Sequence, residues 1–255
     1  MSKNFYAKTN EGYTIKILAE LLQNIIKTAS FRVTHQGIFL RMFDSRECIL
    51  VDVELHSDKF HKYELEEEFN IGINLIHFYR MLKSIKKKDE LALYTIDGEP
   101  DLLYIEVYPK DHEGMSRSVI HAEFLQCVDI TLPTEYTNPV IIPSDKYQRT
   151  IKEMINLGDG SIDILMKKYF LKISCESNQI YQSSVFFGDV SDESPDRFHQ
   201  KFHNEFFTRT IKLTGLSSEI YVYGDIGLPL KLKTNAGHVG NVSIYINPNR
   251  IEEDN

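Results

Sequence analysis

Apolar side chains recur every three or four residues in four stretches of the chain, and this spacing predicts amphipathic helices. The first covers residues 13–26, with apolar positions at Ile15, Leu18, Leu22, Ile25 and Ile26. The second follows Asn74, a good N-cap residue, and runs over residues 74–88. The third is predicted from an N-cap at Ser144 to a stop at Gly158, and the fourth over about residues 202–213.

Strict alternation of apolar and polar residues between these helices predicts strands. The clearest case is Ile49 to Leu55, where every second residue from Ile49 onward is apolar. Residues 31–43 and 47–55 are predicted as the first two strands, split by a polar turn at Asp44-Ser45. The remaining predicted strands cover residues 69–73, 91–96, 102–108, about 119–125, 162–166, 170–175, 180–187, 220–223, 228–233 and 242–246.

The order of these elements repeats. Each half of the chain reads as a helix, strands, an acidic loop (residues 64–68 or 191–196), a second helix and more strands. Corresponding helices are offset by about 130 residues, which indicates an internal duplication.

A proline-containing stretch separates the two halves. Pro133, Pro139 and Pro143 cannot donate ladder hydrogen bonds, so residues 124–143 do not form a central strand. The stretch also lacks the glycine and serine of a flexible linker. We therefore predict an N-terminal domain at residues 1–123, a connector at 124–138 and a C-terminal domain at 139–255.

Composition narrows the class of protein. The 255 residues are 42% hydrophobic and 26% charged, which is ordinary for a soluble globular protein. No apolar run approaches the roughly 20 residues of a membrane helix, and the first residues contain no apolar signal core. We expect a protein inside the cell with no membrane partner. The three cysteines, Cys48, Cys127 and Cys175, indicate neither a disulfide framework nor a zinc site.

The net charge of −8 disfavours nucleic acid until the charges are placed along the chain. The second predicted helix carries five cations and no acid: Arg80, Lys83, Lys86, Lys87 and Lys88. Cations three residues apart share one helix face, as in Arg80/Lys83, Lys146/Arg149/Lys152 and Arg209/Lys212. If the helices line one side of a sheet layer, that side suits phosphate contacts on duplex DNA without sequence preference. The alternative is that these lysines only keep surface helices soluble.

No enzyme motif emerges. The chain has no GxSxG and no Gly-Lys dipeptide, so a nucleophile elbow and a P-loop are excluded. His199 and His203 have metal-pair spacing without an evident third ligand, and Asp192, Glu193 and Asp196 lack the calcium-loop pattern. We predict no catalytic residue, no metal and no cofactor.

Short motifs in a fixed order then point to one family. They are Phe39 to Ser45, the F-x-x-Y of Phe60 to Tyr63, Gly72 to Leu75, Pro143-Ser144, Leu157 to Asp159, Leu216 to Ser218, Leu228 to Leu230 and Tyr245 to Pro248. Their order and spacing over nearly the whole chain resemble the proliferating cell nuclear antigen family of DNA sliding clamps. The match is divergent, since Asn247-Pro248-Asn249 stands where the family usually has Ala-Pro-Lys. Such divergence fits a large DNA virus or a deep-branching eukaryote.

The resemblance implies the DNA clamp fold, an α+β architecture of two similar domains, each with two helices packed on antiparallel sheets. It implies a closed homotrimeric ring around duplex DNA that tethers DNA polymerase and other replication and repair proteins, loaded by a separate ATP-driven clamp loader. The implied location is the nucleus, or a cytoplasmic replication site if the source is viral.

The resemblance also implies two sets of site residues. The DNA-facing residues are Lys16, Arg80, Lys83, Lys146, Arg149, Lys152, Arg209 and Lys212. The groove for a partner peptide is lined by Met42, Asp44, Leu50, Ile130, Leu132, Pro133, Pro229, Tyr245, Ile246 and Pro248.

Three departures from the family pattern bear on these sites. Glu20 and Gln23 lie on the lysine face of the first helix, and Glu205 falls where a cation is common. The turn Lys167-Lys168-Tyr169 lacks the family's glycine, so no modification is predicted there. Two other readings remain open: a monomeric processivity factor or one subunit of a heterotrimeric clamp, and an enzyme on a duplicated α+β scaffold.

Overall fold

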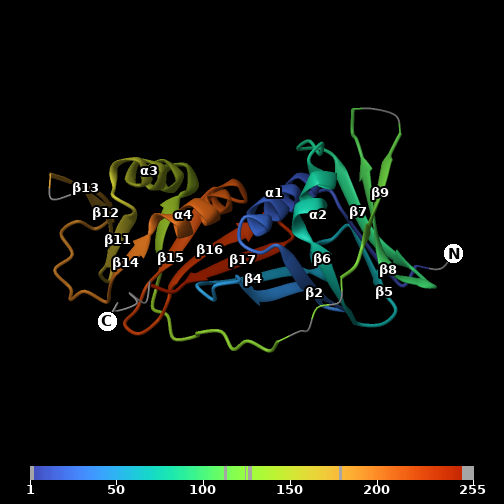
Figure 1. The fold of residues 1–255 in the computed structure, drawn as a ribbon, viewed down its shortest axis with the longest axis horizontal. Helices are drawn as coiled ribbons and strands as arrows, with labels where there is room; N and C mark the ends of the chain where they lie inside the picture. Colours follow the sequence, from blue (N-terminus) through green and yellow to red (C-terminus); the bar gives the residue numbers. More distant parts are fainter. Residues whose placement is uncertain (1–2, 112–113, 124, 126–127, 178–179, 249–255) are drawn as a thin grey trace. The chain divides into compact units, whose positions relative to one another are not determined.

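The computed structural model describes residues 3–111, 114–123, 125, 128–177 and 180–248 (Figure 1). Parts of the predicted connector (residues 124, 126 and 127, with Cys127) and Asn249 lie outside this range. The chain forms two compact units. Unit 1 takes the described residues of Met1–Met42, Val51–Ile130 and Asn235–Val242, and unit 2 those of Phe43–Leu50, Thr131–Thr234 and Ser243–Asn255. Each unit thus borrows a short segment from the other half of the sequence.

Unit 1 contains two helices among antiparallel strands. The elements from the first half of the chain are β1 (Phe5–Thr9), α1 (Gly12–Gln23), β2 (Thr28–Thr34), β3 (Gly37–Phe43), β4 (Ile49–His56), the 3-10 turn η1 (Ser57–Lys59), β5 (Lys62–Leu65), β6 (Phe69–Asn74), α2 (Leu75–Leu82), β7 (Glu90–Ile96), β8 (Glu99–Tyr108) and β9 (Ser116–His121).

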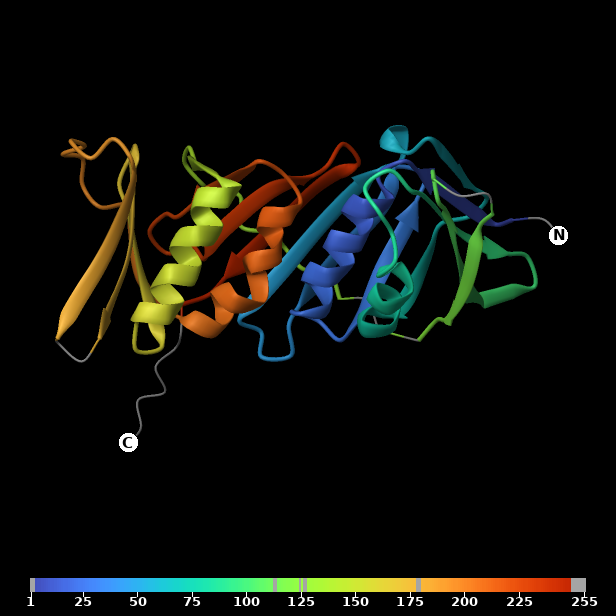
Figure 2. The same cartoon turned by 90° about the horizontal axis from the view of Figure 1, so that it is seen from above.

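Two sheets of unit 1 enclose its core. One has the strand order β5-β1-β7-β8-β9, and the other contains β4, β3, β2 and β6 in that order. Helices α1 and α2 contact each other, and Figure 2 shows them side by side over the strands. The apolar faces of both helices point into this core: Leu18 and Leu22 of α1 and Leu82 of α2 are at most 3% exposed.

Unit 2 repeats this plan. Its elements are β10 (Val140–Pro143), α3 (Ser144–Leu157), β11 (Ser161–Met166), β12 (Phe170–Ser177), β13 (Tyr181–Gly188), β14 (Phe198–His203), α4 (Asn204–Thr210), the 3-10 turn η2 (Ile211–Gly215), β15 (Glu219–Tyr223), β16 (Leu230–Ala236) and β17 (Gly240–Ile246). Its strands pair in the orders β13-β12-β11-β14 and β10-β15-β16-β17. Helices α3 and α4 contact each other, as α1 and α2 do (Figure 2).

The predicted α+β duplication is therefore confirmed. In both halves a strand leads into a helix, three strands follow, and a fourth strand leads into the second helix before three more strands. Strand β5, which pairs with β1, is the main addition in the first half.

Several element boundaries were predicted wrongly. Residues 31–43 form two strands with a turn at His35 and Gln36, and the second helix ends at Leu82 rather than at residue 88. Ser144 is not the cap of α3, because Pro143 holds the N-cap position. The fourth helix starts at Asn204, after a strand that the prediction lacked.

The strands that the sequence did not predict are short or lack a clear alternation of apolar and polar residues. In β14 only Phe198 and Phe202 are buried, and the three exposed polar residues between them hide the alternation. Strand β10 tolerates Pro143 because it lies at a sheet edge. Strands β1 and β5 were also unpredicted, although β1 alternates buried and half-buried residues from Phe5 to Thr9.

No helix in the portion of the chain that the structure covers has the length and apolar character needed to cross a membrane.

We expect Asn74→Ala to lower the free energy of unfolding by about 1 kcal/mol, because the Asn74 side chain accepts the backbone N–H of His77 at 3.2 Å and so caps α2. Asn74→Asp keeps an acceptor and should keep most of this stability. Urea unfolding of both variants checks the prediction. Equal losses in the two variants would contradict the capping role.

Candidate DNA-facing surface and partner groove

Helix α3 presents the clearest row of predicted cations. Lys146, Arg149 and Lys152 are exposed, while Tyr147, Ile151 and Met154 on its other face are at most 3% exposed. No ion pair involving these three cations occurs within the described parts of the chain. The side of α3 that faces away from the core therefore offers positive charge to a ligand, although Asp145 and Glu153 are exposed as well.

Helix α2 offers fewer helical cations than the sequence predicted. Arg80 is exposed near its end, and the exposed Lys83 is its C-cap residue. Lys86, Lys87 and Lys88 were counted as part of this helix but follow it. They remain exposed, so the charge is present on a different element.

Lys16 of α1 is engaged within unit 1. Its Nζ donates a hydrogen bond to the backbone carbonyl of Ile85 at 2.8 Å, and the side chain is half-buried beside the ring of Tyr13. A phosphate contact by Lys16 would have to compete with this bond.

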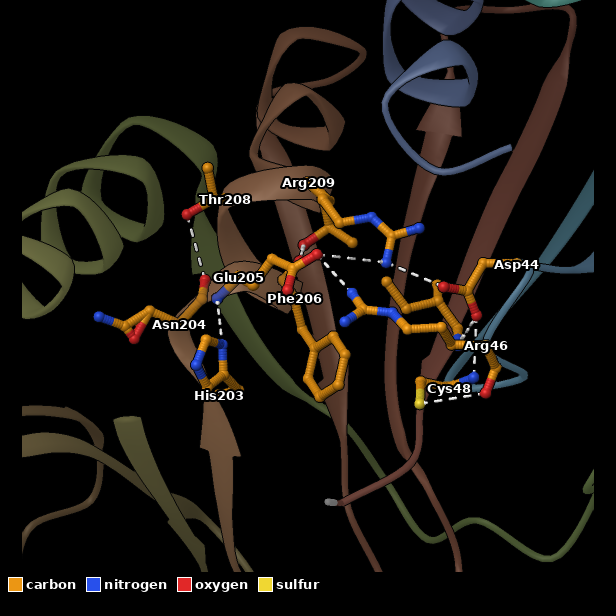
Figure 3. Close-up of polar contacts among 11 residues, drawn as sticks. Asp44, Arg46, Cys48, His203, Asn204, Glu205, Phe206, Thr208 and Arg209 are labelled. Atoms are coloured by element: carbon orange, nitrogen blue, oxygen red, sulfur yellow. Dashed lines mark hydrogen bonds and ion pairs between the residues drawn. The ribbon is translucent and has the colours of Figure 1, made fainter. Parts of the chain in front are cut away.

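Arg209 of α4 is also held internally (Figure 3). Its guanidinium lies 2.8 Å from a carboxylate oxygen of Asp44, and the Arg209 side chain is only 16% exposed. Glu205 lies 3.9 Å from the same guanidinium and also binds Arg46. Lys212, the second predicted cation here, lies in the 3-10 turn η2 and is half-buried. This part of unit 2 uses its positive charge to neutralise its own acids.

Asp44 is the centre of that arrangement. Its side chain is fully buried, and its second oxygen accepts the backbone N–H groups of Cys48 and Ile49, each at 2.8 Å. A buried carboxylate is stable only when its oxygens are satisfied, and here three donors satisfy them. Asp44 was predicted to line the partner groove, but its carboxylate is occupied inside unit 2.

The other predicted groove residues differ in accessibility. Leu50, Tyr245 and Ile246 are at most 4% exposed. The half-exposed ones, which retain surface for a ligand, are Met42, Ile130, Leu132, Pro133, Pro229 and Pro248.

Tyr136 joins two of these groove residues and was absent from the prediction. Its hydroxyl donates to the carbonyl of Pro229 at 2.9 Å, and its ring contacts those of Tyr223 and Tyr245. The ammonium of Lys231 lies 5.1–5.3 Å from the centres of all three rings. Burial raises the pKa of Tyr136, so its hydroxyl stays a donor at neutral pH. An aromatic residue inside a proline-containing connector was the available sequence signal.

A mostly buried ion pair fixes the end of the connector to unit 2. Arg197 lies 3.5 Å from Asp225, and their side chains are 13% and 12% exposed. Arg197 also donates to the carbonyl of Asn138 at 2.9 Å, and Asp225 accepts the N–H and hydroxyl of Thr137 at 3.0 and 2.8 Å. No sequence signal marks this cluster, because its members lie far apart along the chain.

The two histidines with metal-pair spacing have separate roles. His199 lies 3.1 Å from Asp163, and the Nδ1 of His203 accepts the backbone N–H of Glu205 at the start of α4. Within the residues that the structure places, no three His, Cys, Asp or Glu side chains gather as a metal site.

We expect Arg209→Met to lower the free energy of unfolding by about 3 kcal/mol, because it leaves the carboxylate of Asp44 buried without its cation. Arg46→Met is the matched control, since its ion pair with Glu205 is about half exposed and should contribute less than about 1 kcal/mol. Urea unfolding of both variants, of Asp44→Asn and of the double variant Asp44→Asn/Arg209→Met measures the coupling free energy between Asp44 and Arg209. Similar losses for Arg209→Met and Arg46→Met would contradict the role given to the buried pair.

Comparison with known proteins shows which proteins this chain resembles. The family model for the proliferating cell nuclear antigen, N-terminal domain, matches residues 4–129. The chain is 21% identical to the probable DNA polymerase sliding clamp 1 of Paramecium bursaria Chlorella virus 1 over 254 residues, 96% of each protein. It is 26% identical to the DNA polymerase sliding clamp of Thermococcus onnurineus over 233 residues, 90% of this chain and 92% of the relative.

A solved structure supports the fold over the full length. The crystal structure of the proliferating cellular nuclear antigen from Entamoeba histolytica matches with a TM-score of 0.85 at 18% identity, covering 97% of this chain and 100% of that one. The predicted clamp fold is thereby confirmed. Residues 4–129 therefore match the N-terminal domain of the proliferating cell nuclear antigen family, and the whole chain has the fold of a proliferating cellular nuclear antigen.

Proposed function

We propose that this chain is a DNA polymerase processivity factor: a subunit of a homotrimeric ring that encircles duplex DNA and tethers DNA polymerase and other replication and repair proteins. The observation that carries the proposal is the set of exposed cations on and beside α2 and α3 in a chain whose net charge is −8. The names of the viral and archaeal relatives, DNA polymerase sliding clamps, support the same function.

The charge pattern suits a sliding protein. Exposed lysines and arginines attract phosphates regardless of base sequence, and such contacts weaken steeply with salt. Retention on DNA would then come from the closed ring and not from affinity. The acidic remainder of the chain repels DNA from other surfaces.

Two sheet edges are suited to ring closure. A three-fold ring needs one head-to-tail interface between two different surfaces of the subunit. Strand β9 ends one sheet of unit 1 and β13 ends one sheet of unit 2. They carry exposed apolar residues, Val119 on β9 and Tyr181 and Phe186 on β13, which are 38%, 45% and 49% exposed.

The opposite edges of the same two sheets are protected. Strand β5 exposes Lys62 and Glu64, and β14 exposes His199, Gln200 and Lys201. Charged edge strands resist pairing with other chains. We therefore propose that β9 of one subunit pairs with β13 of the next.

The remaining partners follow from this role. A short peptide of the polymerase or another client would bind at the half-exposed groove residues, with aliphatic and aromatic anchors. The chain itself would act without catalysis, and a separate ATP-driven loader would open the ring. Its place would be the site of DNA replication, in the nucleus or in a cytoplasmic viral factory.

Two other assemblies would serve the same function. The chain would be one subunit of a heterotrimeric clamp, or it would act as a monomer. Both differ from the homotrimer in the mass of the purified chain.

We expect light scattering to give a mass near three times 29.6 kDa for the chain alone. Phe186→Lys should lower it toward 29.6 kDa, because it places a charge on the apolar edge of β13. Ile226→Lys is the control, since Ile226 is 83% exposed outside any strand and should leave the mass unchanged. A persistent single-chain mass for the unaltered protein would exclude the homotrimer.

Loading by an ATP-driven loader onto nicked circular DNA should give a complex that survives high salt. Linearising the circle should release the protein, because an open end lets a ring slide off. Gel filtration before and after cutting measures this. Equal loss from circular and linear DNA would contradict encirclement.

A further inference from the structure

The segment directly after α2 is the most basic part of unit 1. We call residues Lys83 to Lys88 the basic turn. Lys83, Lys86, Lys87 and Lys88 are all exposed, and no acid occurs from Arg80 to Lys88. None of the four lysines takes part in an ion pair among the described residues.

A buried carboxylate shapes the backbone of the basic turn. Asp89 is 4% exposed, and its side chain accepts the backbone N–H of Lys86 at 2.8 Å and that of Lys110 at 3.3 Å. The backbone N–H of Asp89 donates to the carbonyl of Lys86 at 3.1 Å. Asp89 therefore binds the main chain of the turn, and none of these hydrogen bonds involves a lysine ammonium group.

Helix α1 holds the turn from the other side. The backbone of Gly12 approaches the carbonyl oxygen of Asp89 so closely that a Cβ on residue 12 would lie 2.7 Å from it. One turn later in α1, the Nζ of Lys16 donates to the carbonyl of Ile85 at 2.8 Å. Ile85 itself is 1% exposed and fixes the centre of the turn in the core.

The result is a fixed backbone that carries free charges. A preformed loop loses less conformational entropy when it binds a ligand. Lysine ammonium groups act as point charges that bind phosphate without reading bases. The turn lies on the same side of the strands as α1 and α2 (Figure 1), and its charges continue those of Arg80.

We propose that the basic turn is a binding site for the backbone phosphates of duplex DNA, and that Lys16 is a positioning residue that holds this turn. The inference rests on the proposed function for the identity of the ligand. It adds Lys86, Lys87 and Lys88 to the DNA-facing residues and gives Lys16 a different task from direct contact.

The first test compares two variants of equal charge. Lys86→Gln/Lys87→Gln/Lys88→Gln removes the turn's cations, and Lys59→Gln/Lys62→Gln/Lys168→Gln removes three exposed lysines elsewhere. Binding to a short fluorescent duplex with open ends is measured by anisotropy at several salt concentrations. The slope of log K against log salt should fall in magnitude by about 1 or more in the turn variant, since each phosphate contact contributes about 0.9. The control variant should keep the original slope.

A slope that is the same in the unaltered chain, the turn variant and the control would overturn the site. So would a control variant that loses as much slope as the turn variant, because the effect would then be that of net charge alone.

The second test separates positioning by Lys16 from direct contact. Lys16→Met should weaken DNA binding in the unaltered chain but have little further effect in the turn variant, since both act through the same lysines. Lys16→Met removes the hydrogen bond to the carbonyl of Ile85, so the amide of Lys86, which donates to Asp89 in the same turn, should exchange about fivefold faster without DNA. Fully additive losses of affinity with unchanged exchange would show that Lys16 contacts DNA directly and would overturn its positioning role.

Failure of the ring and failure of the site give different results. A chain that is retained on circular DNA but has unchanged salt dependence in the turn variant would lack this site and keep the proposed function. If the chain has the mass of a single subunit but its DNA binding still depends on Lys86, Lys87 and Lys88, the proposed site holds and the proposed ring is contradicted. No salt-dependent binding by the unaltered chain would overturn the site.

Discussion

The fully buried carboxylate of Asp44 determines how one whole corner of unit 2 is built. A charge in that position destabilises the fold unless donors surround it. The backbone N–H groups of Cys48 in the β3–β4 loop and of Ile49 at the start of β4 meet this need, together with the guanidinium of Arg209. The loop accepts a left-handed backbone at Glu47, with φ of 56°, to bring these donors together. Arg209 is thus committed to the fold before any ligand arrives.

The need of buried acceptors for a donor also divides the other cations of the chain into two groups. Lys16 satisfies a main-chain carbonyl and Arg197 satisfies Asp225, so both stabilise structure. Lys86, Lys87 and Lys88 after α2, and the three cations on the outer face of α3, have no such acceptor among the described contacts and remain exposed. A cation therefore stays available to an external ligand where no buried acceptor of the chain lies close to it, whatever its position in a helix. This explains why a count of helical charges overestimates α4 and misplaces the charge of α2.

The sequence predicted what depends on local periodicity and little that depends on pairing across the chain. The predicted third helix is present as α3, where one helix face buries Tyr147, Ile151 and Met154. Strand β14 escaped prediction because its buried Phe198 and Phe202 are separated by three exposed polar residues. The partners of Arg209 and Arg197 escaped it as well, since Asp44 lies 165 residues from Arg209 and no periodicity links such positions.

The connector illustrates how such long-range contacts bear on binding. Its prolines indicated an extended segment, and the structure adds that Tyr136 and Thr137 are fixed to unit 2 by hydrogen bonds to Pro229 and Asp225. The residues just before them, Leu132 and Pro133, are half-exposed and have no such bonds among the described contacts. A segment anchored at one end can adjust its free part to a partner peptide at little entropic cost, because the anchored end already limits its conformations. Leu132 and Pro133 can therefore shift while Tyr136 stays in place.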